Sequence, residues 1–279
     1  MALSILNNIP ALAAQNQLTI TGAALSRTLF RLASGTRINS GADDAAGLAI
    51  ADGLRASITA LSQSSRNAND GIGSLSVADG ALAQISNLLN RAITLGTEAA
   101  TGTVSDDQRG ALDTEFQAIL SEIDRIGSST TFNGTSVFTT TATSIFLSDA
   151  STNTEIASST QAVSSANLTS DGSTVINLSD DLLTSVASAT TAISEVNDAI
   201  EQVALLRGEI GATINRLHSA VTVIANQVLN LTNAEDGFRA ADIAVEIANL
   251  TKFQILNQTG LAALSQANAQ QQNVLTLLR

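Results

Sequence analysis

Apolar residues recur along much of the chain at alternating intervals of three and four, the spacing that places side chains on one face of an α-helix. The longest series runs from residue 182 to residue 231 and predicts one continuous helix about 75 Å long with a coiled-coil seam. Arg207 stands at the one seam position that is not apolar. The apolar seam positions are Leu182, Val186, Ala189, Ile193, Val196, Ile200, Val203, Ile210, Ile214, Leu217, Val221, Ile224, Val228 and Leu231.

Two shorter apolar stripes lie upstream and predict helices that can cover this seam. They are separated by a polar turn at residues 102–107, in which Ser105 is placed to cap the second helix. We therefore expect an antiparallel helix pair, and because a long amphipathic helix is not stable alone in water, we expect the three long helices to form one bundle. The stripes are Leu75, Ala78, Leu82, Ile85 and Leu89, then Leu112, Phe116, Ile119, Ile123 and Ile126.

The helical period disappears between residues 128 and 174, where 24 of 47 residues are Ser or Thr. Such a polar segment is typical of the protein surface. Phe132-Asn133-Gly134 is a turn signal, and residues 144–148 and 173–178 have short β-like patterns, with Asp171-Gly172 as a tight turn before the second. We expect one or two small hairpins at the end of the bundle.

The two ends of the chain carry no charged side chain, over residues 1–26 and 253–278. Both mix aliphatic residues with Asn and Gln, and amides can be buried at lower cost than charges when they find partners. A short amphipathic helix is marginal in water, so we expect these ends to be weakly ordered alone and to fold against copies of themselves. The alternative is that they are frayed termini. The proposed assembly residues are Ile5, Ile9, Leu12, Leu18, Leu25, Leu29, Leu32, Ile243, Ile247, Leu250, Leu261, Leu264, Val274 and Leu278.

Composition and charge argue against several classes of protein. A net charge of −12, with Lys252 as the only lysine, disfavours nucleic-acid binding. No apolar run approaches the roughly 18 residues that a membrane span needs. The uncharged first 26 residues lack the basic start of a secretory signal peptide, so we expect any export to use another route. The absence of cysteine rules out disulfides.

Nothing in the sequence indicates catalysis, and we expect neither an enzyme nor a cofactor. His218 is the only histidine, so there is no histidine cluster for a metal and no obvious nucleophile-base pair. Asp43-Asp44 could be read as paired catalytic carboxylates. A helix cap is the stronger interpretation, because the pair follows Ser40-Gly41 and precedes a helical pattern, and Arg37 is close enough to pair with it. Arg207 either extends its head group towards Glu201, Glu209 or a neighbouring helix, or selects the register of the seam.

Several long motifs resemble bacterial flagellin, in the order that this family has them. In the amino-terminal half these are LASGTRINSGADDAAGLAIA at residues 32–51, SRNANDGI at 65–72 and TFNG at 131–134. In the carboxy-terminal half they are Gly211 with Asn215-Arg216-Leu217, then Asn230-Leu231, QILNQ at 254–258 and QNVLTLLR at 272–279. From these motifs we single out Arg37, Asn39, Asp43, Asp44, Asn215 and Arg216, and we add Arg207 as a candidate for register control.

The resemblance implies a mainly α fold: a long antiparallel coiled-coil bundle with one or two small β-hairpins, and terminal helices paired with each other. Residues 1–42 with 236–279 would form the inner filament core, residues 43–134 with 180–235 the bundle, and residues 135–179 a short variable segment without large outer domains. The implied function is a structural subunit of the extracellular flagellar filament for swimming motility. The nearest alternatives are a hook-filament junction protein of the same family and a generic coiled-coil tether.

The resemblance also implies partners: copies of the chain itself, an export chaperone, the filament cap and hook-junction proteins, with export through the flagellar type III apparatus. Ser/Thr clusters at 139–141, 158–160 and 164–165 could carry O-linked glycans or be plain solvated linker. At the position of the family's innate-receptor contact, Arg91, Leu95 and Glu115 fit the pattern. Ile93 and Thr94 replace an Arg and a Glu there, so we expect weak recognition.

Overall fold

The structure is a computed structural model that describes residues 8–139, 143–148, 155–158, 163–165, 178 and 182–277. It confirms the mainly α fold with two small hairpins. The chain divides into two compact units, which we call the terminal unit (Met1–Ala56 with Asn230–Arg279) and the bundle unit (Ser57–Leu229). The elements are α1 (Ile9–Ser34), α2 (Ala45–Ala99), α3 (Asp106–Ser129), β1 (Thr131–Phe132), β2 (Thr135–Ser136), β3 (Thr143–Phe146), β4 (Glu155–Ser158), α4 (Val186–Arg239) and α5 (Ile243–Leu277).

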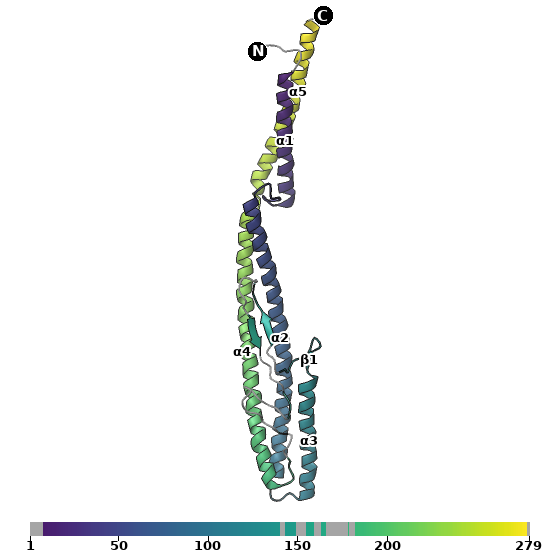
Figure 1. The fold of residues 1–279 in the computed structure, drawn as a ribbon, viewed down its shortest axis with the longest axis vertical. Helices are drawn as coiled ribbons and strands as arrows, with labels where there is room; N and C mark the ends of the chain where they lie inside the picture. Colours follow the sequence, from purple (N-terminus) through teal and green to yellow (C-terminus); the bar gives the residue numbers. More distant parts are fainter. Residues whose placement is uncertain are drawn as a thin grey trace. The chain divides into compact units, whose positions relative to one another are not determined.

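The bundle unit is built from α3 and from the parts of α2 and α4 that lie within residues 57–229, side by side in Figure 1. Its core is aliphatic, with Phe116 of α3 fully buried among leucines and isoleucines of α2. The three-helix bundle expected from the apolar spacing is therefore confirmed. The core positions of α4 in this unit are Ala189, Ala192, Val196, Ala199, Val203, Leu206, Ile210, Leu217 and Ile224.

Our assignment of the α4 seam was wrong at alternate positions. Ala192, Ala199 and Leu206 occupy the core, where we had placed Ile193, Ile200 and Arg207 one residue further on. The isoleucines lie half-buried at the edge of the seam. Alanine in the seam lets the helices approach closely, and the neighbouring larger side chains then cover the sides of the contact. Arg207 consequently lies beside the seam and not within it.

The turn between α2 and α3 is held by the predicted cap. The Ser105 Oγ accepts from the backbone N–H of Gln108, at 3.4 Å, and the Gln108 side chain accepts from the N–H of Ser105, at 3.0 Å, which is a complete capping box. The buried Arg109 donates to the carbonyls of Ala99 (2.9 Å) and Thr101 (3.4 Å), where α2 ends, and pairs with Asp106 (2.7 Å). These contacts satisfy carbonyls that the end of a helix leaves free.

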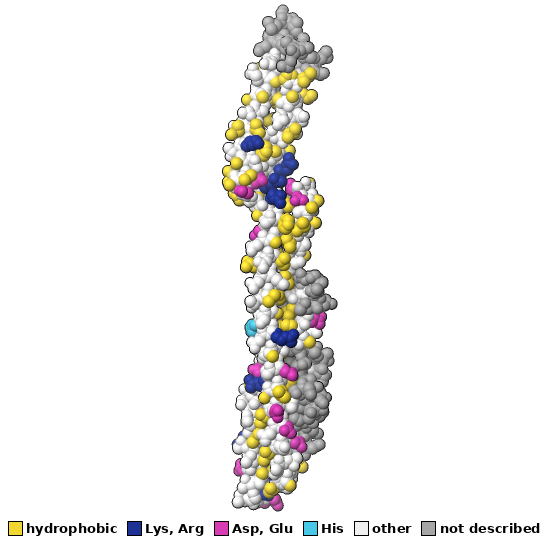
Figure 2. All heavy atoms as spheres, turned by 90° about the vertical axis from the view of Figure 1, so that its left-hand side faces the viewer, with side chains coloured by type: hydrophobic (Ala, Val, Ile, Leu, Met, Phe, Trp, Pro, Cys, Tyr) yellow, Lys and Arg dark blue, Asp and Glu magenta, His cyan; other side chains and the backbone are white. Residues whose placement is uncertain are grey.

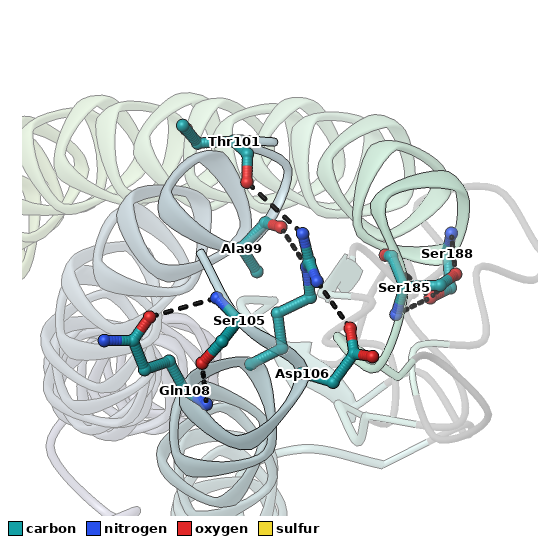
Figure 3. Close-up of polar contacts among 8 residues, drawn as sticks. Ala99, Thr101, Ser105, Asp106, Gln108, Ser185 and Ser188 are labelled. Carbon is teal, nitrogen blue, oxygen red and sulfur yellow. Dashed lines mark hydrogen bonds and ion pairs between the residues drawn. The ribbon is translucent and has the colours of Figure 1, made fainter. Parts of the chain in front are cut away.

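The start of α4 lies at the same end of the bundle unit, as Figure 3 shows. Ser185 and Ser188 exchange hydrogen bonds between side chain and backbone in both directions, at 3.0 and 3.2 Å. The N–H of Leu183 donates to the Asp113 carboxylate of α3 at 2.7 Å. All three helix ends at this tip are therefore closed by polar side chains.

Two antiparallel hairpins follow α3. In the first, β1 pairs with β2 across Asn133 and Gly134, which have φ angles of 51° and 79°. Two consecutive positive φ angles are typical of a type I′ turn, and this turn was predicted from the sequence. In the second, β3 pairs with β4, with Ile145 opposite Ile156. The predicted β-like stretch 144–148 overlaps β3, whose partner β4 we had not identified; residues 173–177 of the second predicted stretch lie outside the described part of the chain.

We had expected the hairpins at the end of the bundle, but they lie along the side of α2. Ser64 of α2 donates to the carbonyl of Ser148 at 2.8 Å, and an added Cβ at Gly71 would overlap Ile145. Phe132 packs beside Gly73. α3 is less than half as long as α2, with 24 residues against 55, and the hairpins contact α2 between Ser64 and Gly73.

In the terminal unit, α1 and α5 lie side by side and antiparallel (Figure 1). Asn8 donates to the carbonyl of Ala267 at 3.2 Å, and Arg31, near the other end of α1, pairs with Glu246 in the first turn of α5. The pairing of the terminal helices is thus confirmed.

Candidate assembly surface

The inner face of α1 follows the same three-four spacing as the bundle but holds smaller and more polar side chains. The helix starts at an Asn8 cap, with Pro10 in its first turn, and ends at Gly35, whose φ of 69° suits glycine. Only two residues of α1 are fully buried, and both are threonines. The seam positions are Ala11, Ala14, Leu18, Thr21, Leu25, Thr28 and Leu32.

The side of α5 that faces α1 also holds mainly small and polar side chains. An added Cβ at Gly260 would lie 3.2 Å from Leu18, so the helices are close at this point. Glu246 is the only fully buried residue of α5 among those whose side chains are described. The contact between α1 and α5 therefore removes little apolar surface from water. The seam positions are Glu246, Leu250, Phe253, Asn257, Gly260, Leu264, Ala267 and Gln271.

The outer face of α1, opposite this seam, carries a second apolar stripe that no described residue covers. We call Ile9, Leu12, Ile20 and Phe30 the outer stripe; their exposed fractions lie between 54% and 69%. Ile9 and Leu12 border a shallow depression of about 570 Å³, which Gln15, Asn16 and Thr19 complete. Large apolar side chains that stay exposed along one face of a helix indicate an interaction site.

The exposed apolar side chains of α5 lie on more than one face of the helix. A helix that is apolar on several sides is typically buried by its surroundings. On the face of the terminal unit that Figure 2 shows, hydrophobic side chains are spread along the helices, whereas charged ones lie mainly in one group. The exposed large apolar residues of α5 are Ile243, Val245, Ile247, Ile255, Leu256 and Leu261.

Arg31 contacts two carboxylates of the terminal unit. Its guanidinium is 3.4 Å from the Asp43 carboxylate and 3.5 Å from that of Glu246. The pKa of Asp43 is held below its ordinary value, chiefly by the backbone N–H of Asn39 and next by the Ser40 hydroxyl; burial opposes the shift, and Arg31 adds to it. Our pairing of Arg37 with the Asp43-Asp44 pair was wrong, because Arg31 occupies that place.

The two carboxylates have separate structural tasks. Asp44 accepts from the N–H of Gly47 at 2.9 Å and caps α2, as predicted for this pair. Arg37 instead donates to the carbonyl of Phe238 at 2.9 Å. An antiparallel bridge between Thr36 and Ala240 joins the connection after α1 to the one before α5.

No described helix is sufficiently long and apolar to cross a membrane. Within the described residues there is also no group of three or more His, Asp or Glu side chains that could hold a metal ion.

Comparison with known proteins identifies the family. The family model of the bacterial flagellin N-terminal helical region matches residues 5–143, and that of the C-terminal helical region matches residues 193–278. The chain is 34% identical over 275 residues to a flagellin of Halalkalibacterium halodurans, a match that covers 98% of both chains. The chain belongs to the bacterial flagellin family.

Further flagellin relatives and a solved structure agree. The flagellar filament 33 kDa core protein of Treponema phagedenis is 33% identical over 288 residues, covering 98% of this chain and 99% of the relative. A putative flagellar hook-associated protein from Vibrio parahaemolyticus superposes with a TM-score of 0.61 over 71% of this chain and 100% of its own, at 16% identity, which is a likeness of fold. The prediction of a structural subunit of the flagellar filament is confirmed, and the junction-protein and tether alternatives are not favoured.

The remaining residues that we had singled out lie in different places in the bundle unit. Arg207 of α4 bonds Asp79 of α2 at 2.8 Å across the bundle unit. Asn215 and Arg216 are exposed on α4. The expected receptor patch is only partly on the surface: Arg91 pairs with Glu115 at 2.7 Å, with both side chains about half exposed, but Leu95 is fully buried.

Leu95 belongs to the core because it continues the buried stripe of α2, so its place in the receptor patch was wrong. The other predicted assembly residues divide by face. Leu18, Leu25, Leu32, Leu250 and Leu264 are half-buried in the seam, whereas Leu29 is exposed like the outer stripe. Ile5 and Leu278, and the side chain of Val274, lie outside the described part of the chain.

Sequence reasoning missed Glu246 and Asp79, the carboxylates opposite Arg31 and Arg207. Glu246 could have been found, because it is the one charged residue in phase with the α5 seam. Asp79 has no such signal, since it is an ordinary half-exposed residue that becomes notable only beside Arg207.

Proposed function

We propose that the terminal unit is the polymerisation element of this flagellin and that α1 and α5 pack against copies of themselves to form the inner core of the filament. Residues 1–42 with 236–279 would form this core, residues 43–134 with 180–235 the next shell outward, and residues 135–179 a short outer segment. With so short an outer segment, the filament should be thin and smooth. The observation that carries the proposal is the outer stripe of α1.

The energetics favour burial of this stripe by a neighbouring subunit. A large aliphatic or aromatic side chain contributes about 1.5–3 kcal/mol when it is fully buried. Four such side chains are more than half exposed on one helix, while the seam on its other side is made largely of Ala, Thr and Leu. A helix pair with so small an interior gains more from contacts with other subunits than from its own seam.

We also propose that the uncharged ends favour passage of the unfolded chain through a narrow lumen, because few fixed charges would then hold it there. Gln15 and Gln270 are both exposed, on α1 and α5 respectively. Replacing both with Glu should lower filament yield and growth. Unchanged yield and growth would contradict this part of the proposal.

Other parts of the proposal rest on family resemblance. The chain would have no catalytic activity, and it would leave the cell through the flagellar type III apparatus without a cleaved signal peptide. An export chaperone, the filament cap and hook-junction proteins would bind it. The Ser/Thr clusters would be the sites of any O-linked glycans, which mass spectrometry of the native protein would detect.

The direct test is electron microscopy and sedimentation of the purified protein. The full chain should form long filaments, whereas a junction protein would form rings. Deletion of residues 261–279 should leave soluble subunits that keep most of the helicity of the bundle unit, measured by circular dichroism.

A matched control removes residues 149–154, which belong to the proposed outer segment and not to the core. This variant should still polymerise. Continued polymerisation after deletion of residues 261–279 would contradict the proposal.

A further inference from the structure

The seam between α1 and α5 leaves the alignment of the two helices ambiguous over most of its length. From Asn8 to Ser26 and from Phe253 to Leu277 it lacks charged side chains. Its contacts are made by small, aliphatic and amide residues that repeat every seven positions. Because a heptad seam stays in phase when one helix moves by seven residues, α5 could slide along α1 by about 10 Å and still present a seam.

At Gly260, side-chain size does little to prevent such a shift. In the observed register, Leu18 lies against Gly260. A shift of seven residues in one direction would put Leu25 at the same glycine, which exchanges one leucine for another. A shift in the other direction would put Ala11 there, and alanine is smaller.

The charged pair at the base of the helices does discriminate between registers. Glu246 faces Arg31, and seven residues further along α5 stands Phe253. A shift that way would leave the Arg31 guanidinium against an aromatic ring and Glu246 without its cation. The opposite shift would also separate Glu246 from Arg31, because Arg31 would then lie opposite the chain before Ile243, where α5 starts. An uncompensated buried charge is strongly unfavourable.

We propose that Arg31 and Glu246, with Asp43 holding Arg31 from the other side, set the register of α1 against α5. They are positioning residues: they fix which apolar residues of α5 lie level with the outer stripe of α1. The inference rests on the proposed function in one respect, since every subunit must present the same composite surface if copies are to pack regularly.

The geometry of the Arg31–Glu246 pair indicates that the pair selects the register of the two helices and adds little to the stability of the subunit. The Glu246 side chain is only 9% exposed, yet its Oε2 has no hydrogen-bond partner, and neither has the buried Nε of Arg31. The two groups meet at 3.5 Å, so the pair is not fully bonded. Buried ion pairs of this quality often add no net stability compared with apolar residues of similar size, whereas they do select one alignment.

A competing explanation is that the backbone fixes the register. Thr36 bridges Ala240, and the N–H of Ala241 donates to the carbonyl of Gly35 at 3.0 Å, close to the charged pair. The experiment must therefore remove the charges and leave this bridge intact. The double variant Arg31→Leu/Glu246→Leu does so.

Because the chain has no cysteine, engineered cysteine pairs can report the register. Gly260→Cys is combined with Leu18→Cys for the observed register, and with Leu25→Cys or Ala11→Cys for the two shifted ones. Disulfides are formed in polymerised protein and in free subunits, then quantified by peptide mass spectrometry. Mixing isotope-labelled and unlabelled chains separates links within a chain from links between chains.

With the native charges, the Leu18→Cys pair should cross-link in large excess. In Arg31→Leu/Glu246→Leu, the ratio of shifted to observed links should rise at least about tenfold, while the thermal midpoint of the subunit stays the same or increases. Glu246→Gln, which keeps the shape, should give a smaller rise in the same direction. The matched control Lys252→Leu removes an α5 charge that has no ion pair among the described residues, and it should leave the ratio unchanged.

An unchanged ratio in the double variant would overturn the inference and assign the register to the backbone bridge. A fall in thermal midpoint with no change in the ratio would also overturn it, because the pair would then be merely structural. A different result would contradict the proposed function: the chain with native charges would not polymerise. The ratio of shifted to observed links could still be measured in free subunits.

Discussion

The bundle unit and the terminal unit use the same heptad spacing with different contents. In the bundle unit, the positions that repeat every three and four residues hold Phe116, Leu82 and Ile85, all fully buried. In the terminal unit, the corresponding positions of α1 that are fully buried hold Thr21 and Thr28. Spacing decides which helix faces meet, and side-chain size decides whether their contact can sustain a fold alone.

The largest effects that this difference predicts are on the stability of the free subunit. Phe116→Ala should lower the free energy of unfolding by about 3–5 kcal/mol, since it leaves a cavity in a closed core. Leu25→Ala, at a half-buried seam position of α1, should change it by less than about 1 kcal/mol. Urea denaturation of unpolymerised protein, followed by circular dichroism, measures both. Equal losses would mean that the terminal unit has a core of its own.

The comparison becomes sharper with two leucines of equal exposure. Leu29 in the terminal unit is 48% exposed, and Leu205 in the bundle unit is 49% exposed. Burial of Leu29 between subunits would make Leu29→Gln raise the critical concentration for polymerisation about tenfold or more. Leu205→Gln should change it by about twofold at most. Sedimentation of the polymer at a series of protein concentrations gives these values, and the reverse order would place the main contact on the bundle unit.

The smallest effect concerns the ion pair between Arg207 and Asp79. Both side chains are about 40% exposed, unlike the deeply placed Glu246, so Arg207→Leu should change the stability of the subunit by no more than about 1 kcal/mol. We expect the effect on filament shape, because the pair lies across the contact of α2 with α4. Electron microscopy compares the shapes. Filaments of normal shape would end the idea that Arg207 selects a register in the bundle unit.

The sequence was sufficient for the parts of the fold that repeat. The three-four spacing identified the three long helices of the bundle, and the Asn133-Gly134 dipeptide identified the first hairpin. The Ser105 cap and the Asp44 cap were also predictable, because capping depends on neighbours in the chain. These features are local, so the residues that decide them stand together in the sequence.

The errors lie where contacts between distant residues decide the result. Ile193 and Ala192 are both apolar, and only the packing of α4 against the rest of the bundle shows that alanine takes the core position. Arg31 and Arg37 are equally plausible partners for Asp43 in the sequence, but the last turn of α1 directs Arg31 to it. β4 could not be identified as the partner of β3, because the Ser/Thr-rich stretch offers several similar short patterns.

The capped turn between α2 and α3 also bears on the order in which the subunit folds. It joins two helices through residues 100–105, so their hairpin can close with little loss of chain entropy and can form early. The α4 segment arrives across a much longer stretch of chain and would then dock on a surface that is already formed. The two helices would thus form a folding nucleus that needs neither end of the chain.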